Sequence, residues 1–358
     1  MTDVLNSCLE DLEARIDEQQ EEELLAAWQK FVADECDTDY FVSPRRRACQ
    51  SRTVWPEVAV NQAIDDVEAM LLGQLGGCSQ ALANGGDLLL NVRANYGTGI
   101  LPSLFGCELF MMDTELNTLP TVKPLGSLEA VKAVVDAGPP DIHNALGGRT
   151  LEAGERFMEA MGRYPKIARY VSLYHPDLQG PINVAELIWG SDIFLAYYDE
   201  PDLLRGLLEV ITQTYRQFLR AWYDMAERPG ETSVHWGLLH GGAIVLRNDS
   251  LMNLSPDTYT EFVQPYDQRL LDEFGGGAVH FCGRGDHYIE LMSRMRGLTA
   301  INLTQPEYND METIFRHTVD KGIKIIGLEA RGIQGVDRPL RGRVHVSSPA
   351  ESPGPRRG

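Results

Sequence analysis

The segment GAVHFCG, residues 277–283, carries the strongest indication of both fold and chemistry in this chain. Its apolar first half is typical of a buried strand, and Gly283 marks the end of that strand. Side chains two positions apart on a strand lie on the same face, so His280 and Cys282 project side by side. An imidazole and a thiol placed in this way can share one zinc ion. Two such residues are more often, however, a buried histidine next to a small apolar cysteine in a core.

Short apolar runs of the same kind recur along the chain. They cover residues 88–92, 171–174, 233–238, 243–246, 278–282, 298–303 and 323–328. Segments with the period of an amphipathic helix lie between them, at residues 127–137, 150–163, 184–197, 201–226, 256–273, 286–296 and 310–321. Apolar strands that alternate with helices predict a parallel sheet covered on both faces. Seven or eight such units over roughly 270 residues match a (β/α)8 TIM-type barrel. The alternative, a doubly wound open sheet, is disfavoured because no G-x-G-x-x-G motif follows a first strand.

The sequence pattern divides the chain into three parts. Residues 1–84 are predicted to form an acidic N-terminal helical extension, with amphipathic helices at 3–33 and 57–83. Residues 85–330 are predicted to form the barrel. Residues 331–358 are rich in Arg, Pro and Ser and show no apolar period, so they are predicted to be a disordered tail.

The composition excludes several classes of function. A net charge of −20 over 358 residues argues against a nucleic-acid-binding protein, which needs a basic face. The sequence shows neither a secretory signal nor an apolar run near the ~18 residues of a membrane span. The six cysteines are widely scattered, as expected for reduced thiols. We therefore expect a cytoplasmic protein with a small-molecule substrate and no membrane or nucleic-acid partner, in which residues 1–84 either cap the barrel or form a homodimer contact.

The active site of a parallel barrel lies at the carboxyl ends of its strands. That rule selects polar and aromatic side chains that follow or end the apolar runs. They are Arg93, Tyr96, Tyr174, His175, His235, Trp236, His240, Arg247, Asp249, His280, Cys282, Asn302 and Glu329. Taken singly, each has an ordinary structural explanation, such as an ion pair for Arg93 or a turn position for Asp249.

Part of this pattern resembles the uroporphyrinogen decarboxylase superfamily. The matching residues are Asn248-Asp249-Ser250, Leu254-Ser255-Pro256, Gln264-Pro265-Tyr266 and His280-Phe281-Cys282-Gly283, with Gly180-Pro181 and Tyr198-Asp199-Glu200-Pro201 upstream and GIKIIG, residues 322–327, downstream. The resemblance covers about residues 85–330 and leaves out the acidic N-terminal part. It implies a (β/α)8 barrel with a pocket at the carboxyl ends of the strands, in agreement with the strand–helix pattern.

The resemblance implies one of two chemistries. One branch of the superfamily removes the acetate carboxylates of uroporphyrinogen without a cofactor, with the help of an aspartate and N-terminal arginines. The other branch consists of zinc methyltransferases that move methyl groups between a corrinoid protein and a thiol, and it carries His-x-Cys and a later Cys as zinc ligands. This chain lacks the N-terminal arginine motif, since residues 45–47 do not match it. It has His280 and Cys282, but no cysteine follows Cys282.

The first hypothesis is therefore a zinc-dependent methyltransferase-like enzyme that works with a corrinoid partner protein. The resemblance makes His280 and Cys282 zinc ligands and expects the third ligand near the end of the last strand, where the carboxylate of Glu329 can replace the missing thiolate. Asp249 and His240 are alternatives for the third ligand. The predicted catalytic residues are Asp249, His235 and Asn302. The predicted substrate-binding residues are Arg93, Tyr96, Tyr174, His175, Trp236, His240 and Arg247.

Two other hypotheses stay open. A cofactor-free decarboxylase of uroporphyrinogen or a related substrate would use Asp249 to stabilise a protonated ring, and Arg93 and Arg247 to hold carboxylates. A non-catalytic tetrapyrrole-binding barrel would explain the incomplete ligand set. Bound zinc that is lost with Cys282 favours methyl transfer, whereas tetrapyrrole binding without zinc favours the other two hypotheses.

Overall fold

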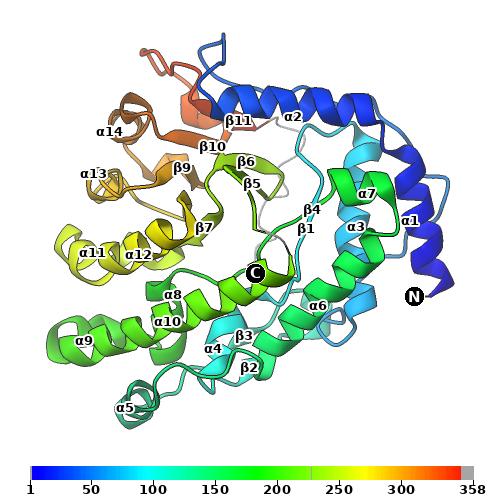
Figure 1. Cartoon of the computed structure of the whole chain (residues 1–358). Helices are drawn as coiled ribbons and strands as arrows, with labels where there is room; N and C mark the ends of the chain where they lie inside the picture. Colours follow the sequence, from blue (N-terminus) through cyan, green and yellow to red (C-terminus); the bar gives the residue numbers. More distant parts are fainter. Residues whose placement is uncertain (1, 227, 348–358) are drawn as a thin grey trace.

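The central element of the fold is a five-stranded parallel sheet in the order β11-β10-β9-β8-β7, with helices packed outside it (Figure 1). The structure is a computed structural model and describes residues 2–226 and 228–347. The strands are β1 (Asn91–Val92), β2 (Leu109–Phe110), β3 (Thr121–Val122), β4 (Ser172–Leu173), β5 (Thr232–His235), β6 (Leu238–Gly241), β7 (Ile244–Arg247), β8 (Gly277–Phe281), β9 (Leu298–Leu303), β10 (Lys324–Glu329) and β11 (Val344–Ser347).

Helices fill most of the connections between these strands. The α-helices are α1 (Asp3–Arg15), α2 (Glu18–Val32), α3 (Val67–Asn84), α4 (Ile100–Leu104), α5 (Leu128–Ala137), α6 (Ala145–Met161), α7 (Pro165–Tyr170), α8 (Pro181–Trp189), α9 (Ile193–Asp199), α10 (Pro201–Met225), α11 (Pro256–Phe262), α12 (Gln264–Phe274), α13 (Ile289–Met292) and α14 (Met311–His317). The 3-10 helices are η1 (Gly97–Gly99), η2 (Thr114–Leu116), η3 (Asp249–Asn253), η4 (Pro306–Tyr308), η5 (Val319–Lys321) and η6 (Ala330–Ile333).

The five-stranded sheet is apolar on both faces, as the continuous apolar runs predict. Val279 and Phe281 of β8 belong to the large core that includes the surrounding helices. Ala278 of the same strand belongs to a second, smaller core with Val245 of β7 and Ala300 of β9. Alternate side chains of one strand therefore enter two different cores, and the smaller core lies on the inner face of the sheet.

A β-hairpin covers this inner face. Strands β5 and β6 pair antiparallel from Thr232 opposite Gly241 to His235 opposite Leu238, and β6 contacts β8, β9 and β10. The two residues of the turn, Trp236 and Gly237, have φ angles of 53° and 78°. The prediction of one continuous strand over 233–238 is wrong, because the chain reverses at this two-residue turn with positive φ.

The N-terminal part is built into the fold. The predicted helix over 3–33 divides into α1 and α2, because the side chain of Asp17 caps a new helix start. The helix predicted from residue 57 begins only at Val67, where Asp66 caps it. Trp28 and Phe31 of α2 are fully buried in the smaller core with the inner face of the sheet. These residues therefore complete the core.

The segment after β10 is more ordered than predicted. Residues 330–333 form η6, and β11 pairs with β10 as a further parallel strand. Val344, His345 and Val346 are all buried, and this short apolar segment forms the added strand. The Arg-rich composition around it hides the strand from a sequence-based prediction. A parallel bridge also joins Phe41 to His345 at this edge. The rest of the predicted disordered tail, residues 348–358, lies outside the described residues.

The remaining strands form small sheets beside the main one. Strands β1 and β4 pair in parallel, with Asn91 opposite Ser172, while β2 and β3 pair antiparallel. The alternation of strand and helix over β7 to β10 is confirmed. The described strands form four separate sheets. The largest of them is parallel and is surrounded by helices, so the fold is α/β with a parallel core. Within residues 2–226 and 228–347 no helix is both long and apolar enough to cross a bilayer.

The close approach of Gly242 to Gly276 yields a prediction about stability. Gly242 ends the hairpin at φ 79°, and a Cβ there would lie 2.2 Å from the Gly276 carbonyl carbon. Gly242→Ala should lower the free energy of unfolding by about 2 kcal/mol or more, because both the φ angle and the backbone contact are incompatible with a side chain. Urea unfolding measures this. Gly77→Ala within α3 is the control, since a Cβ there meets nothing within 4 Å and should be neutral or stabilising. Equal stability of the Gly242 variant and the wild type would contradict the account.

Candidate metal centre

The register of three neighbouring strands places three polar side chains in one row. Arg247 at the end of β7 is opposite His280 of β8, and His280 is opposite Asn302 of β9. Val245 and Ala278, two residues earlier on β7 and β8, belong to the smaller core on the inner face. Because strand side chains alternate, the polar row shares that face. The sheet therefore ends in polar side chains directly beyond a packed apolar core.

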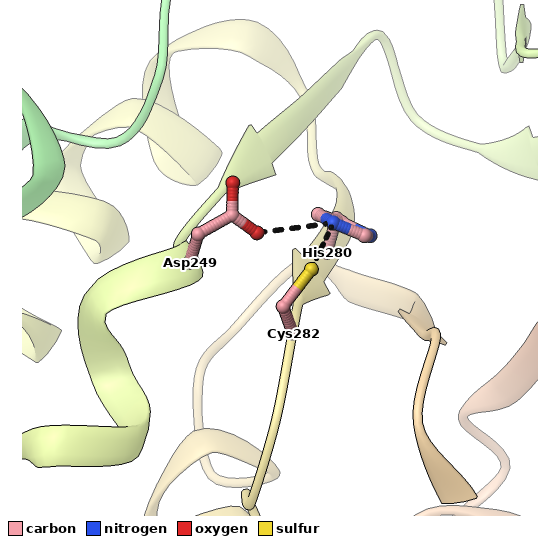
Figure 2. Close-up of side chains that lie close together, drawn as sticks. All are labelled: Asp249, His280 and Cys282. Atoms are coloured by element: carbon pink, nitrogen blue, oxygen red, sulfur yellow. Dashed lines mark hydrogen bonds and ion pairs between the residues drawn. The ribbon is translucent and has the colours of Figure 1, made fainter. Parts of the chain in front are cut away.

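Two further side chains make this row a compact cluster. Asp249 begins η3 shortly after β7, and Cys282 directly follows β8. Nε2 of His280 lies 3.2 Å from Oδ1 of Asp249 and 3.5 Å from Sγ of Cys282, and Figure 2 shows both side chains directed at the imidazole. One donor atom from each residue lies within 4.8 Å of the other two. In the part of the chain that the structure describes, this is the group of His, Cys, Asp and Glu side chains that can hold a metal ion.

The three donors fit zinc. Bonds of about 2.1 Å to nitrogen or oxygen and about 2.3 Å to sulfur, at the tetrahedral angle, separate the ligand atoms by about 3.3–3.6 Å. The separations of 3.2 Å and 3.5 Å from the imidazole nitrogen are of this size. The side chain of Asp249 is 44% exposed and that of His280 12%, while Oδ1 of Asp249, the oxygen nearest His280, is itself buried. Three protein ligands with one open position are typical of catalytic zinc sites.

Neighbouring polar groups fix the orientation of the His280 and Cys282 side chains. The side-chain amide of Asn302 donates to the Ile326 carbonyl at 2.6 Å, which leaves its oxygen as the acceptor for Nδ1–H of His280 at 2.7 Å. Nε2 of His280 is therefore the nitrogen that faces Asp249 and Cys282. The hydroxyl of Thr304 donates to Sγ of Cys282 at 3.3 Å. Such supporting hydrogen bonds orient metal ligands and set their basicity.

The cluster attracts positive charge. Burial alone would lower the pKa of His280, but the hydrogen bonds and charges of Asp249 and Cys282 raise it to about 10. Burial would likewise raise the pKa of Asp249, whereas the hydrogen bond and charge of His280 lower it. Without a metal, the imidazole thus keeps a proton between two acidic side chains. A zinc ion bound here would displace that proton, as metal binding to protonated ligands does.

A largely buried ion-pair network of Arg247, Arg93 and Asp177 adjoins the cluster. Nη1 of Arg247 lies 2.7 Å from Oδ1 of Asp177, and Nη1 of Arg93 lies 3.4 Å from Oδ2 of the same carboxylate. Burial alone would raise the pKa of Asp177, but the charges of both arginines lower it to about 2. Cζ of Arg247 lies 4.8 Å over the ring of Trp236, and that ring lies 5.4 Å from the ring of His280. Trp236 therefore connects the network to the cluster.

The predicted histidines form a separate buried chain. Nδ1 of His240 donates to the Gly241 carbonyl at 2.9 Å, so its Nε2 accepts the hydrogen bond from Nδ1 of His235, also at 2.9 Å. The ring of His235 lies 4.4 Å from the ring of His175 and 5.2 Å from that of Tyr174. Burial lowers the pKa of His240 to about 4, and burial together with the nearby Arg247 charge lowers that of His175 to about 3. These imidazoles are therefore neutral at neutral pH.

Two predicted site residues lie apart from this assembly. Tyr96 is buried, and the guanidinium of Arg149 lies 5.4 Å over its ring. Glu329, predicted as the third metal ligand, ends β10 and pairs with Arg331 at 2.6 Å. Asp249, named above as an alternative for the third ligand, lies beside His280 instead, because η3 packs against β8.

Sequence reasoning missed two acidic residues that support the cluster. Asp177 joins both arginines and stands in the loop after β4, where the same rule of strand ends could have selected it. Asp267 lies within α12 and gives no sequence signal. It accepts a 2.7 Å hydrogen bond from Asn248, the residue before Asp249, while its other oxygen is buried without a partner. The backbone N–H of Asn248 also donates to the His280 carbonyl at 2.8 Å.

Comparison with known proteins gives a structural match. No protein-family model matches the sequence, and no curated protein does. A methyltransferase from Methanosarcina mazei has a similar solved structure, with a TM-score of 0.55, 15% sequence identity, and coverage of 86% of this chain and 83% of the other. At this identity the similarity shows a common fold. The chain therefore has an α/β fold of the kind seen in that methyltransferase.

The carboxyl group of Asp267, which has one buried oxygen without a partner, predicts a pH dependence of stability. Burial raises the pKa of Asp267 to about 7. Between about pH 5 and pH 7 the unfolded chain has lost this proton while the folded chain keeps it, so the free energy of unfolding should fall by up to about 1.4 kcal/mol per pH unit as pH rises. Asp267→Asn should remove that contribution and become more stable relative to the wild type as pH rises. Urea unfolding of both proteins at pH 5, 6 and 7 measures it, and a constant difference would contradict the assignment.

Proposed function

We propose that this chain is a zinc-dependent, methyltransferase-like enzyme that moves a methyl group between a corrinoid carrier and a thiol or related acceptor. One observation carries the proposal. A nitrogen, an oxygen and a sulfur donor from Asp249, His280 and Cys282 lie together at separations that suit one tetrahedral zinc ion. The fold shared with a methyltransferase is consistent with it.

The donor set suits thiol chemistry. A zinc ion held by these residues would supply an open position at which a thiol would lose its proton near neutral pH. Asp249, His280 and Cys282 would hold the ion, and an acceptor would approach from the side on which Asp249 is exposed. Asn302 keeps Nδ1 of His280 protonated, so that Nε2 faces the metal position. Thr304 supports the sulfur of Cys282.

The proposal extends to a barrel architecture and to a separate corrinoid protein as partner. The helices outside the parallel sheet, the β1–β4 pair and the bridge from Phe41 to β11 support a (β/α)8-type barrel whose wall is interrupted between the small sheets. The cluster then lies at the carboxyl ends of the strands, where such barrels carry their active sites. The methyl group would come from, or go to, a corrinoid held by a separate protein that docks at this end.

The first test is the zinc content of the purified full-length chain after dialysis against a weak chelator. The wild type should hold about one zinc per chain, since three ligands of this kind bind zinc tightly. Cys282→Ala should hold almost none. Cys49→Ala is the matched control, because Cys49 is an exposed free thiol outside the cluster and its loss should leave zinc unchanged.

A folded wild type that takes up no zinc would overturn the proposal. Titration with a tetrapyrrole would then decide between the remaining hypotheses: turnover of uroporphyrinogen identifies a cofactor-free decarboxylase, and binding without turnover identifies a non-catalytic barrel. Zinc that survives in Cys282→Ala would mean that the metal binds elsewhere.

A second test concerns Asn302. Asn302→Leu removes the acceptor for Nδ1–H of His280 while it keeps the size of the side chain. The loss of a hydrogen bond that orients a metal ligand should weaken zinc binding by about 10–100-fold. Competition with a zinc-sensitive dye measures the affinity. The control is Asn84→Ala, because Asn84 lies at the exposed end of α3. Asn309→Leu would not serve, because the Asn309 side chain accepts a hydrogen bond from the backbone of Gly285 in a nearby loop. Unchanged affinity in Asn302→Leu would show that Asn302 is not a support for the metal.

A further inference from the structure

One edge of the Arg247 guanidinium has no partner among the described residues. Nη1 is used, by Asp177 at 2.7 Å and by the Pro176 carbonyl at 3.2 Å. Nε and Nη2 are buried and donate to nothing in the structure. The residue as a whole is 2% exposed. Two charged N–H donors are thus enclosed without an acceptor, which costs free energy unless something fills the place.

The two free donors have the geometry of a particular ligand. Nε–H and Nη2–H of a guanidinium point in parallel along one edge, and this fork matches the two oxygens of a carboxylate. Asp177 occupies only the Nη1 side, so the Nε–Nη2 edge of Arg247 stays free for a second acid. The network also has one carboxylate for two arginines, Arg93 and Arg247, and a second anion would balance it.

The position of this edge relates it to the metal cluster. Arg247 and His280 are directly opposite each other on adjacent strands, which lie about 5 Å apart. Trp236 contacts both, with its ring under Cζ of Arg247 and 5.4 Å from the ring of His280. Trp236 has a φ of 53°, a conformation that a bulky residue seldom adopts, at the tip of the β5–β6 turn. The turn thereby holds one aromatic ring against both Arg247 and His280.

We infer that the Nε–Nη2 edge of Arg247 binds a carboxylate group of the substrate. The molecule acted on at the metal cluster is then a small organic acid whose carboxylate lies beside the Trp236 ring. This inference rests on the proposed function for the identity of the reacting group, a thiol. The carboxylate contact itself needs no metal. Arg247 acts here as a specificity-determining residue that anchors one end of the substrate beside Trp236.

The test compares small ligands that differ only in charge. Isothermal titration of the zinc-loaded full chain with 3-mercaptopropionate should show binding at least about tenfold tighter than with 3-mercaptopropanol, because a charge-assisted bidentate contact is lost in the alcohol. Arg247→Lys keeps the charge but removes the fork, and should lose most of this preference. Arg220→Lys is the matched control, since Arg220 lies exposed on α10 in an ion pair with Glu273, and it should keep the preference.

A metal-free arm separates this inference from the proposed function. Butyrate, which has no thiol, should bind the wild type and Cys282→Ala equally well and should bind more tightly than butanol to both. If zinc is absent but butyrate binding depends on Arg247, the proposed function fails and the carboxylate site stands. If zinc binds but butyrate binds no more tightly than butanol, the carboxylate site fails and the proposed function stands.

Three results would overturn the inference. The first is equal affinity of the wild type for 3-mercaptopropionate and 3-mercaptopropanol, which would mean that water alone fills the free edge. The second is an unchanged preference in Arg247→Lys. The third is tighter binding of propanesulfonate or inorganic phosphate than of butyrate, which would assign the edge to a tetrahedral anion. The first and third need no variant and hold even if Arg247→Lys does not fold.

Discussion

The register between β7, β8 and β9 is the constraint on which the rest of the site depends. It sets Arg247, His280 and Asn302 side by side on the inner face, one step beyond the apolar row of the smaller core. A slip of one residue on β8 would turn His280 and Cys282 into the outer core and bring Phe281 inward. The apolar packing of both faces therefore fixes the chemistry as well as the fold.

The polar row is stabilised by charge balance and hydrogen bonds. Buried charges are costly unless they are paired, and the structure pairs Asp177 with two arginines and His280 with Asp249 and Cys282. Pairing is incomplete at the Nε–Nη2 edge of Arg247 and at Oδ1 of Asp267. A protein that only needed stability would be expected to give the buried N–H donors of an arginine an acceptor of its own, so the unpartnered edge of Arg247 supports a binding function.

Much of this arrangement could be predicted from the sequence. The continuous apolar runs predicted the strands β7 to β10, and the period-two spacing predicted that His280 and Cys282 share a face. Asp249 was only an alternative to Glu329 as the third ligand, because no local pattern encodes the path of η3 that brings Asp249 to the pair. The hairpin was missed because Trp236 is an unusual residue for a turn with positive φ. The order of β11 was hidden by the Arg-rich composition around Val344 and Val346, where only tertiary pairing with β10 reveals a strand.

The central claim is that Asp249, His280 and Cys282 bind one zinc ion together, and X-ray absorption at the zinc edge tests it most directly. The account predicts one sulfur neighbour at about 2.3 Å and nitrogen or oxygen neighbours at about 2.0–2.1 Å. Addition of a thiol ligand should raise the sulfur count from one to two. A spectrum with nitrogen and oxygen neighbours alone, or with a sulfur count that does not respond to the thiol, would contradict the account.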